Sequence, residues 1–349
     1  MSEFKKYQSI ENITRTSVMN QIYDMGFEKD EWVVSEKIHG ANASFYLNDE
    51  GIRCGKRSGF LKIGQRFFNW ETVRDAYEDH LKLLYIVCEQ VVQEEVDAKK
   101  GKWDGVLNII LYGELFGGYY PHDTVEADPT AMKVQKGIYY APWNDFYAFD
   151  LKINGRFVHY NIFEEIMSKI GFHYAKALYC GPLKECLAYS NEFPTKLPQK
   201  LGLPSIQDNI CEGVVIKPAM PLFFNNGERV ILKNKNDKFS EVSKSKEPKK
   251  KLNLSLQENE LDLYKEGIRY INENRLRNVL SKIGPVTDKM FGKVQGMFHQ
   301  DVITDWRKDK EEELKDIDKK RVRVIEKNIN NEVQNYVRSV FVDIIDGTF

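Results

Sequence analysis

The stretch "DFYAFDLKINGRFVHY", residues 145–160, decides the class of fold. It places Asn154-Gly155 between two runs of aromatic and branched aliphatic residues. Asn-Gly suits a two-residue turn between antiparallel strands, because both turn positions need a positive φ. The stretch therefore predicts an antiparallel hairpin and not half of a parallel βαβ unit.

Further β-rich runs, separated by turn residues, fill much of the chain between residues 31 and 240. Helical patterns interrupt them at 71–99 and at 161–170, the second of which ends at Gly171. The sequence predicts an α+β fold built on antiparallel sheets. The runs are "EWVVSEKI" (31–38), "ASFYLN" (43–48), "GIRCGKRS" (51–58), "VLNIILYGEL" (106–115), "EGVVIKP" (212–218) and "RVILKNK" (229–235).

The composition changes at "KFSEVSKSKEPKKKLNLS", residues 238–255, which is rich in lysine and lacks an apolar period. Such a segment is typical of an exposed linker. Beyond it, apolar residues recur at three- and four-residue spacing, which indicates helices. We therefore expect a first domain at 1–242, a Lys-rich linker at 243–253 and a helical C-terminal domain at 254–349.

The overall composition is that of an ordinary globular protein of 349 residues with a net charge of -1. Positive charge for a polyanionic partner must therefore be local. The five cysteines are scattered without a C-x-x-C pair, so neither a disulfide framework nor a zinc site is predicted. We find no signal-like segment and no long apolar run, and we expect an intracellular, cytoplasmic protein, of a cell or of an infected host, without a membrane partner.

The first candidate for chemistry is Lys37 in "SEKIHGANASF", residues 35–45. Residues two apart on a strand share a face, so Lys37 and His39 are expected side by side. Most single lysines are surface residues. A lysine that attacks phosphorus must be neutral, and nearby cations favour the neutral amine; Lys233 and Lys235 of "ILKNKNDKF" could supply them.

Other charged residues in apolar runs extend the pattern. Arg57 lies between glycines in "GKRSG", while Glu114 and Glu212 occur in strand-like runs where a lone carboxylate is costly. Mg²⁺ takes one or two protein carboxylates and keeps its other positions for water and phosphate. Phe149 could stack on a purine. Each residue also has a structural interpretation, as an ion-paired glutamate or a core aromatic.

Six motifs in order resemble the nucleotidyltransferase motifs of the covalent-lysine ligase and capping-enzyme superfamily. Within it the chain most resembles the phage-type RNA ligase 2 family, from "FKKYQSIENI" (4–13) to "FGKVQGMFHQDV" (291–302). The motifs are "KIHGAN" (37–42), "RSG" (57–59), "GELFG" (113–117), "FYAFD" (146–150), "EGVVIK" (212–217) and "KNK" (233–235).

The resemblance implies an antiparallel-sheet nucleotidyltransferase domain, like that of an ATP-grasp-type ligase, followed by a small all-helical domain. It also implies an ATP-dependent RNA ligase that seals nicks between a 3′-hydroxyl and a 5′-phosphate in duplex RNA. The reaction would proceed through a lysyl-AMP intermediate and an adenylylated 5′-phosphate end. ATP and Mg²⁺ (or Mn²⁺) are the implied cofactors and nicked duplex RNA is the implied partner, with no protein partner expected.

The resemblance further implies roles for individual residues. Lys37 would carry AMP. Catalytic roles fall to Lys37, His39, Arg57, Lys233 and Lys235, and Glu114 and Glu212 would bind metal. Arg275, Asp301 and Asp305 would serve RNA-end sealing, although Asp305 replaces a glutamate of the family. The nucleotide-binding set is Glu36, Lys37, Ile38, Asn42, Arg57, Glu114, Phe149, Glu212, Lys233 and Lys235.

Two alternatives stand beside this interpretation. The first is a DNA ligase or an mRNA capping guanylyltransferase, which typically has aspartate where this chain has His39 and often appends a β-barrel. The second is a non-catalytic RNA-binding protein that uses "KNKNDKFSEVSKSKEPKKK" (233–251) as an electrostatic patch. The carboxylates Glu114 and Glu212 argue against it, because phosphate affinity alone has no use for them.

Overall fold

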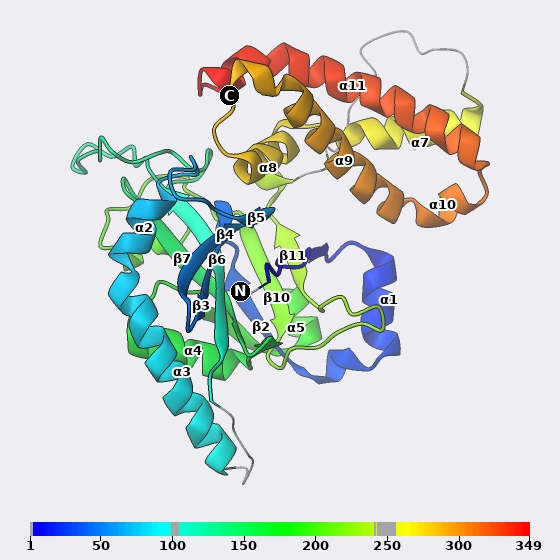
Figure 1. The fold of residues 1–349 in the computed structure, drawn as a ribbon. Helices are drawn as coiled ribbons and strands as arrows, with labels where there is room; N and C mark the ends of the chain where they lie inside the picture. The colour runs from blue at the N-terminus through cyan, green and yellow to red at the C-terminus, as the bar shows by residue number, and fades with distance from the viewer. Residues whose placement is uncertain (1–2, 99–104, 241, 243–255) are drawn as a thin grey trace. The chain divides into compact units, whose positions relative to one another are not determined.

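The chain forms two compact units, Met1–Asn236 and Asp237–Phe349, in the computed structural model (Figure 1). The structure describes residues 3–98, 105–240, 242 and 256–349. The predicted linker at 243–253 lies outside the described residues. Antiparallel sheets in the first unit and helices in the second confirm the predicted α+β class.

The first unit contains two sheets whose described strand pairs are antiparallel, apart from the parallel pair of β1 and β11. One sheet has the order β1 (Glu11–Asn12), β11 (Leu232–Lys235), β10 (Gly213–Pro218), β2 (Glu31–Glu36) and β9 (Ala177–Pro182). The other has the order β5 (Gly59–Phe60), β4 (Gly51–Lys56), β3 (Ala41–Asn48), β6 (Asn108–Gly117), β7 (Asn144–Ile153) and β8 (Arg156–Phe157).

The hairpin predicted at Asn154-Gly155 is confirmed. Both residues have left-handed backbone, with φ of 49° and 79°, and Ile153 pairs with Arg156 across the turn. Strand β8 is shorter than the run "RFVHY" because the chain soon enters a helix. The ring of His159 accepts a hydrogen bond from the Asn161 amide at 3.1 Å and so caps that helix.

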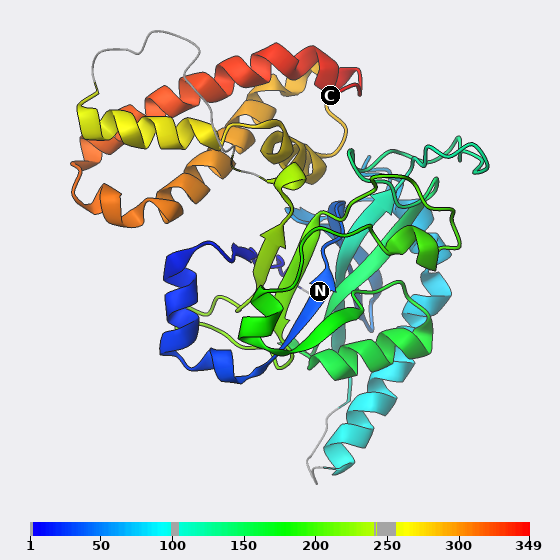
Figure 2. The same ribbon diagram turned by 180° about the vertical axis from the view of Figure 1, so that it is seen from behind.

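Helices cover the outer face of each sheet. Helices α3 (Glu78–Ala98) and α4 (Tyr160–Ile170) pack side by side on the six-stranded sheet, and α2 (Trp70–Ala76) joins the same core (Figures 1 and 2). Helices α1 (Thr16–Asp24) and α5 (Leu183–Leu187) cover the other sheet. The inner faces meet through a smaller cluster that includes Tyr46, Tyr112 and Ile231. This arrangement leaves a cleft between the two sheets.

The remaining short elements of the first unit are α6 (Leu197–Lys200) and a 3-10 turn at Phe27–Lys29. The second unit consists of α7 (Glu258–Arg269), α8 (Glu273–Ile283), α9 (Phe291–Asp309), α10 (Glu311–Lys315) and α11 (Lys319–Ile345), with 3-10 turns at Asp237–Phe239 and Asp288–Met290.

Close helix packing holds the second unit together. A Cβ at Gly267 would lie 2.3 Å from the Ile329 side chain, so glycine lets α7 approach α11. The indole of Trp306 is buried and donates a hydrogen bond to the Leu263 carbonyl at 3.1 Å. No described helix combines the length and apolarity that a membrane crossing requires.

Candidate active site

A cleft between the inner faces of the two sheets collects most of the predicted nucleotide-binding residues. Tyr7, Ile10, Tyr147, Ala175, Val215 and Lys217 contribute to its wall. The predicted residues that line it are Glu36, Lys37, Ile38, Asn42, Arg57, Glu114 and Phe149.

Lys37 and His39 lie where the chain crosses from one sheet to the other. The amide of Lys37 donates to the Gly213 carbonyl at 2.9 Å, and the amide of His39 donates to the Tyr140 hydroxyl at 3.0 Å. The strand expected through Lys37 and His39 is not formed, because β2 ends at Glu36 and β3 begins at Ala41, but the expectation that the two side chains lie side by side is confirmed. A Cβ at Gly40 would lie 2.3 Å from the Leu115 carbonyl oxygen, so glycine allows this tight crossing.

Glu212 brings the two side chains together instead. The Nζ atom of Lys37 lies 2.7 Å from Glu212 Oε2, and His39 Nδ1 lies 3.4 Å from the same oxygen. Lys235 Nζ lies 2.7 Å from the other oxygen, Oε1. Burial alone would raise the pKa of Glu212, but Lys235, Lys37 and His39 together hold it well below its usual value. Glu212 is therefore a buried anion that anchors three cationic or titratable groups.

Glu114 lies on β6 opposite Asn42 of β3. Its Oε2 atom is buried, and no group in the described part of the chain makes a hydrogen bond to it. Burial raises the pKa of Glu114 to about 8, and the nearby Glu212 charge acts in the same direction, while Lys37 and Arg57 oppose the shift. This carboxyl is therefore poised to accept a cation.

A divalent ion fits Glu114 better than Glu212. The Oε2 atom of Glu114 has neither a hydrogen bond nor an ion pair among the described residues. The Oε1 atom of Glu212 also lacks a hydrogen bond, but it lies 2.7 Å from the Lys235 ammonium, and Oε2 lies 2.7 Å from that of Lys37. The described residues contain no cluster of three or more His, Cys, Asp or Glu side chains that could cage a metal. A single carboxylate combined with substrate phosphates is a known way to hold Mg²⁺.

Two basic residues flank the cleft. The Arg57 guanidinium lines it and donates to the Ser9 hydroxyl at 3.4 Å. Lys233 pairs with Val215 across β11 and β10. Directly opposed residues of an antiparallel pair point to the same side of a sheet. Because Val215 lines the cleft, Lys233 is on the cleft side.

Glu36 and Ile38 form part of the wall of the cleft. The Glu36 carboxylate is buried and accepts hydrogen bonds from the Thr195 hydroxyl and, at 3.1 Å, from the Lys196 amide. Burial raises the pKa of Glu36 despite these bonds. Ile38 is also buried. Both residues are therefore fixed in place by the fold.

The sequence did not predict a role for a buried charge cluster that adjoins Phe149. Asp150 accepts a hydrogen bond from the Tyr7 hydroxyl at 2.8 Å and forms an ion pair with Arg229. Lys217 Nζ lies 3.4 Å from Asp150 Oδ1 and donates to the Phe149 carbonyl at 2.9 Å. The motifs "FYAFD" and "EGVVIK" contain Asp150 and Lys217, but nothing in the sequence pairs either one with Arg229.

The protonation states in this cluster follow from burial and charge. Burial alone would raise the pKa of Asp150, but Arg229 and Lys217 hold it below its usual value. Burial lowers the pKa of Lys217 to about 8, although Asp150 opposes the shift. Lys217 therefore contributes a positive charge to the cleft wall that is lost just above neutral pH.

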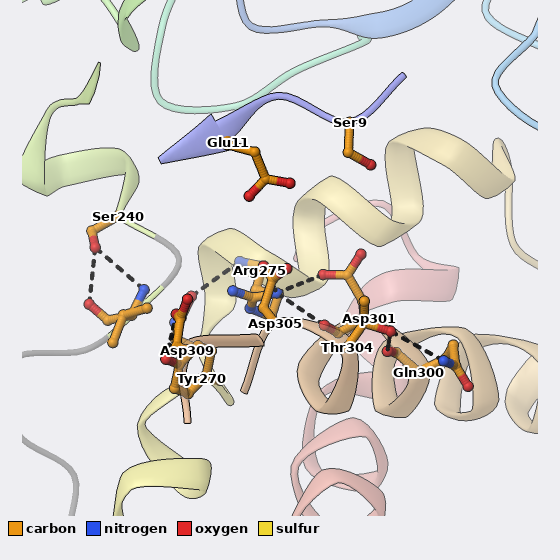
Figure 3. Close-up of polar contacts among 12 residues, drawn as sticks. Ser9, Glu11, Ser240, Tyr270, Arg275, Gln300, Asp301, Thr304, Asp305 and Asp309 are labelled. Atoms are coloured by element: carbon orange, nitrogen blue, oxygen red, sulfur yellow. Dashed lines mark hydrogen bonds and ion pairs between the residues drawn. The ribbon is translucent and has the colours of Figure 1, made fainter. Parts of the chain in front are cut away.

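In the second unit, Arg275, Asp301 and Asp305 come together as one cluster (Figure 3). The Arg275 side chain is only 2% exposed, and its Nη1 atom lies 2.8 Å from Asp301 Oδ2 and 2.9 Å from Asp305 Oδ2. Lys282 Nζ lies 2.7 Å from the other Asp301 oxygen. The spacing of four residues puts both aspartates on one face of α9. Arg275 thus ties α8 to α9.

Comparisons with known proteins agree with this geometry. Residues 30–235 match the family model described as RNA ligase, and residues 254–335 match that of the T4 RNA ligase 2 C-terminal domain. The mitochondrial RNA-editing ligase 1 of Trypanosoma brucei brucei is 29% identical over 327 residues, which cover 84% of this chain but only 65% of that protein. RNA-editing ligase 2 of the same organism is 28% identical over 370 residues, covering 90% of this chain and 86% of that protein.

Solved structures give a weaker match. A Naegleria gruberi RNA ligase variant, solved with ATP and Mn, aligns with a TM-score of 0.41 and 15% identity over 68% of this chain and 59% of that chain.

Proposed function

Because the chain belongs to the RNA ligase family, with a second unit of the T4 RNA ligase 2 C-terminal type, we propose that it is an ATP-dependent enzyme that seals nicks in duplex RNA. The joined ends would be a 3′-hydroxyl and a 5′-phosphate. An intracellular, cytoplasmic location, of a cell or of an infected host, is part of the same proposal.

The observation that carries the proposal is the ion pair of Lys37 with Glu212 in a cleft between two sheets. A lysine amine that attacks phosphorus needs a fixed position and neighbouring positive charge. Glu212 supplies the position, and Lys235 on its other oxygen supplies the charge. Release of Lys37 from Glu212 would free the amine for attack.

Three phosphoryl transfers would follow. The Lys37 nitrogen attacks the α-phosphorus of ATP, a P–N bond forms, and pyrophosphate leaves. The 5′-phosphate of RNA then attacks the same phosphorus, which breaks the P–N bond and restores the lysine. Finally the 3′-hydroxyl oxygen attacks the 5′-phosphorus and AMP leaves. In each step the protein positions the reactants and stabilises charge on the phosphoryl oxygens.

The remaining side chains of the cleft suit the parts of the nucleotide. Phe149 lines the wall, and its edge contact with Tyr7, at 4.9 Å between ring centroids, fixes the ring for stacking on adenine. Arg57 and Lys233 provide positive charge for phosphate oxygens. A Mg²⁺ or Mn²⁺ ion at Glu114 would neutralise phosphate charge.

A labelling experiment tests the proposal. The protein is incubated with Mg²⁺ and, in turn, with ATP, GTP and NAD labelled in the transferred nucleotide, and the chain is separated by denaturing electrophoresis. We expect ATP alone to label it. Label from GTP or NAD would indicate another branch of the superfamily, and no label from any of them would favour a non-catalytic RNA-binding protein.

The substrate is tested with 5′-phosphorylated nicked duplexes of RNA and of DNA. We expect sealing of the RNA nick by the wild-type chain and none by Lys37→Ala. An enzyme that labels itself with ATP but seals only the DNA nick would be a ligase of a different substrate class.

A further inference from the structure

The segment of residues 37–40, which crosses between the two sheets, is held by a side chain where a strand would be held by main chain. It lies outside the strands and contains the predicted nucleophile Lys37 and His39. The amide of Lys37 donates to the Gly213 carbonyl at 2.9 Å, as in a sheet. The amide of His39 instead donates to the Tyr140 hydroxyl at 3.0 Å. One phenol oxygen therefore replaces the carbonyl of a neighbouring strand.

The surroundings of Tyr140 fix its hydroxyl in this place. The side chain is completely buried, and its ring packs edge-on against Phe116 with 5.7 Å between the ring centroids. Burial, together with the nearby Glu36 charge, raises the pKa of Tyr140 well above its usual value. The hydroxyl therefore stays neutral near neutral pH and can accept the amide hydrogen of His39.

Tyr140 lies in the segment between β6 and β7, residues 118–143, and Asn209 holds that segment. The Asn209 side chain is buried. Its Oδ1 atom accepts a hydrogen bond from the Tyr139 amide at 2.9 Å, and its Nδ2 atom donates to the Tyr139 carbonyl at 2.7 Å. Both polar atoms of this side chain therefore fix the main chain next to Tyr140.

The main chain of Asn209 reaches the other side of the nucleophile. Its carbonyl accepts a hydrogen bond from the Thr195 amide at 3.0 Å, and the Thr195 hydroxyl donates to the Glu36 carboxylate. Glu36 directly precedes Lys37. The chain around Lys37 is thus held on both sides, by Thr195 before it and by Tyr140 after it.

The position of this segment matters because Glu212 contacts two of its residues. Lys37 Nζ lies 2.7 Å and His39 Nδ1 lies 3.4 Å from the same oxygen, Glu212 Oε2. A displacement of about 1 Å would disturb these contacts, and errors of this size in a reacting group can cost about a hundredfold in rate. A bond that fixes His39 therefore bears on the attack by Lys37.

We infer that Tyr140 and Asn209 are positioning residues for the formation of the AMP adduct: Tyr140 holds His39, and Asn209 holds Tyr140. This inference rests on the proposed function. Neither side chain is among the described residues that line the cleft, so each acts through the segment of residues 37–40 and not on the nucleotide. A purely structural role for the same bonds would change stability and leave the rate of labelling unchanged.

The test uses the full chain and three variants, Tyr140→Phe, Asn209→Ala and the double variant. The rate of labelling is measured at a series of ATP concentrations, which separates the maximal rate from the half-saturating concentration. Urea unfolding of each variant measures its stability. Hydrogen exchange of the His39 amide, followed by NMR, measures directly whether that amide is held.

Two control variants remove equivalent bonds away from the cleft. Tyr77→Phe removes a hydroxyl that donates to Asp145 at 2.6 Å. Asn144→Ala removes a side chain that accepts from the Met132 amide at 2.8 Å and donates to the Met132 carbonyl at 2.7 Å, the same pattern that Asn209 makes with Tyr139. None of these four control residues is among the described residues that line the cleft.

We expect Tyr140→Phe to lower the maximal labelling rate about tenfold and to leave the half-saturating ATP concentration unchanged, because no nucleotide contact is lost. Asn209→Ala should also lower the maximal rate. The double variant should be no slower than the slower single variant, because Asn209 acts through Tyr140. The His39 amide should exchange faster in the three variants, and both controls should label and exchange like wild type.

A wild-type labelling rate in Tyr140→Phe would overturn the inference, whatever its stability. Equal slowing by Tyr77→Phe and Asn144→Ala would also overturn it, because the loss of any such bond would then have the same effect. Slowing that multiplies in the double variant would separate Asn209 from Tyr140 and refute that part. A wild-type chain that takes no label from ATP would refute the proposed function alone, since exchange of the His39 amide still decides whether the two residues hold it.

Discussion

The Nζ atom of Lys37 lies 2.7 Å from the Oε2 atom of Glu212, so a buried carboxylate holds the predicted nucleophile in an ion pair. Glu212 has a second lysine, Lys235, at the same distance on its other oxygen. The two lysines therefore share one counter-ion. Removal of the nucleophile and removal of the counter-ion should consequently have different effects on stability and the same effect on activity.

Lys37→Ala is expected to abolish AMP labelling and to lower the free energy of unfolding by less than Glu212→Ala does, because Glu212 keeps Lys235 as a counter-ion. Glu212→Ala leaves Lys235 buried without that carboxylate. It should lower the free energy of unfolding by about 3–5 kcal/mol, and it should also abolish AMP labelling. Urea unfolding and labelling of both variants check this. Equal stability losses would show that the lysines do not share Glu212.

The lowered pKa of Glu212 also predicts a pH dependence. A carboxyl whose pKa is lower in the folded than in the unfolded chain stabilises the fold above the unfolded pKa. That contribution is lost as the pH falls through the folded value, so wild type should lose stability toward acid more steeply than Glu212→Gln. Unfolding at a series of pH values below about 5 compares the two. If wild type and Glu212→Gln lose stability toward acid equally steeply, the lowered pKa of Glu212 would be contradicted.

Glu114 should have the opposite pH dependence. Burial raises its pKa to about 8, so the folded chain binds a proton that the unfolded chain has lost above its ordinary pKa. The free energy of unfolding of wild type should therefore decrease as the pH rises from about 5 to about 8, and that of Glu114→Gln should decrease less. Unfolding of both proteins across this range, without metal, is the measurement.

The same substitution tests the metal proposal. Added Mg²⁺ should stabilise wild type at about pH 8, where it competes with the proton for Glu114, and should have less effect on Glu114→Gln. Labelling by ATP should fall about a hundredfold in the variant. A variant that gains as much from Mg²⁺ as wild type, or that labels at the wild-type rate, would place the metal elsewhere.

The lowered pKa of Lys217 predicts that nucleotide affinity decreases in alkaline solution. Its pKa of about 8 means that the cleft wall loses a positive charge just above neutral pH. ATP binding should weaken as the pH rises through this value, and Lys217→Arg should remove the dependence, because arginine stays charged. Binding of a non-hydrolysable ATP analogue to both proteins measures the effect. If ATP binding by Lys217→Arg keeps the pH dependence of wild type, a group other than Lys217 is responsible for that dependence.

Local sequence signals explain what could be predicted. Asn154-Gly155 forms its turn from two adjacent residues, and the motifs around Lys37, Glu114 and Glu212 are short strings whose residues stay together in the fold. The end of β2 at Glu36 was not predictable in the same way, because the crossing between sheets depends on tertiary contacts with β6.

Distant pairs explain what was missed. Arg229 and Asp150 are 79 residues apart in the sequence. The sequence around each residue does not indicate whether its side chain is exposed or forms an ion pair. Arg275 was predicted as a residue for sealing, but its nearly complete burial between two aspartates depends on how α8 packs on α9. Its sealing role stays a prediction.

The division of work between the two units gives the last prediction. The residues of the cleft and its Glu212 ion pairs all lie in the unit Met1–Asn236, which has its own cores. A fragment of residues 1–243 should therefore label itself with ATP. It should fail to seal a 5′-phosphorylated nick, because a duplex needs a longer positive surface than one cleft provides. A fragment that seals as well as the full chain would assign the helical unit to another partner.

Arg275→Ala in the full chain should show a milder form of the same division, with labelling kept and sealing reduced. The substitution also leaves Asp301 and Asp305 without their shared cation, so it should destabilise the helical unit. Arg275→Lys separates the two effects, since a lysine keeps the charge but cannot reproduce the guanidinium contacts. If Arg275→Lys restores the unfolding midpoint but not sealing, sealing requires the Arg275 guanidinium beyond its effect on stability. If it restores both, Arg275 serves only the packing of α8 on α9.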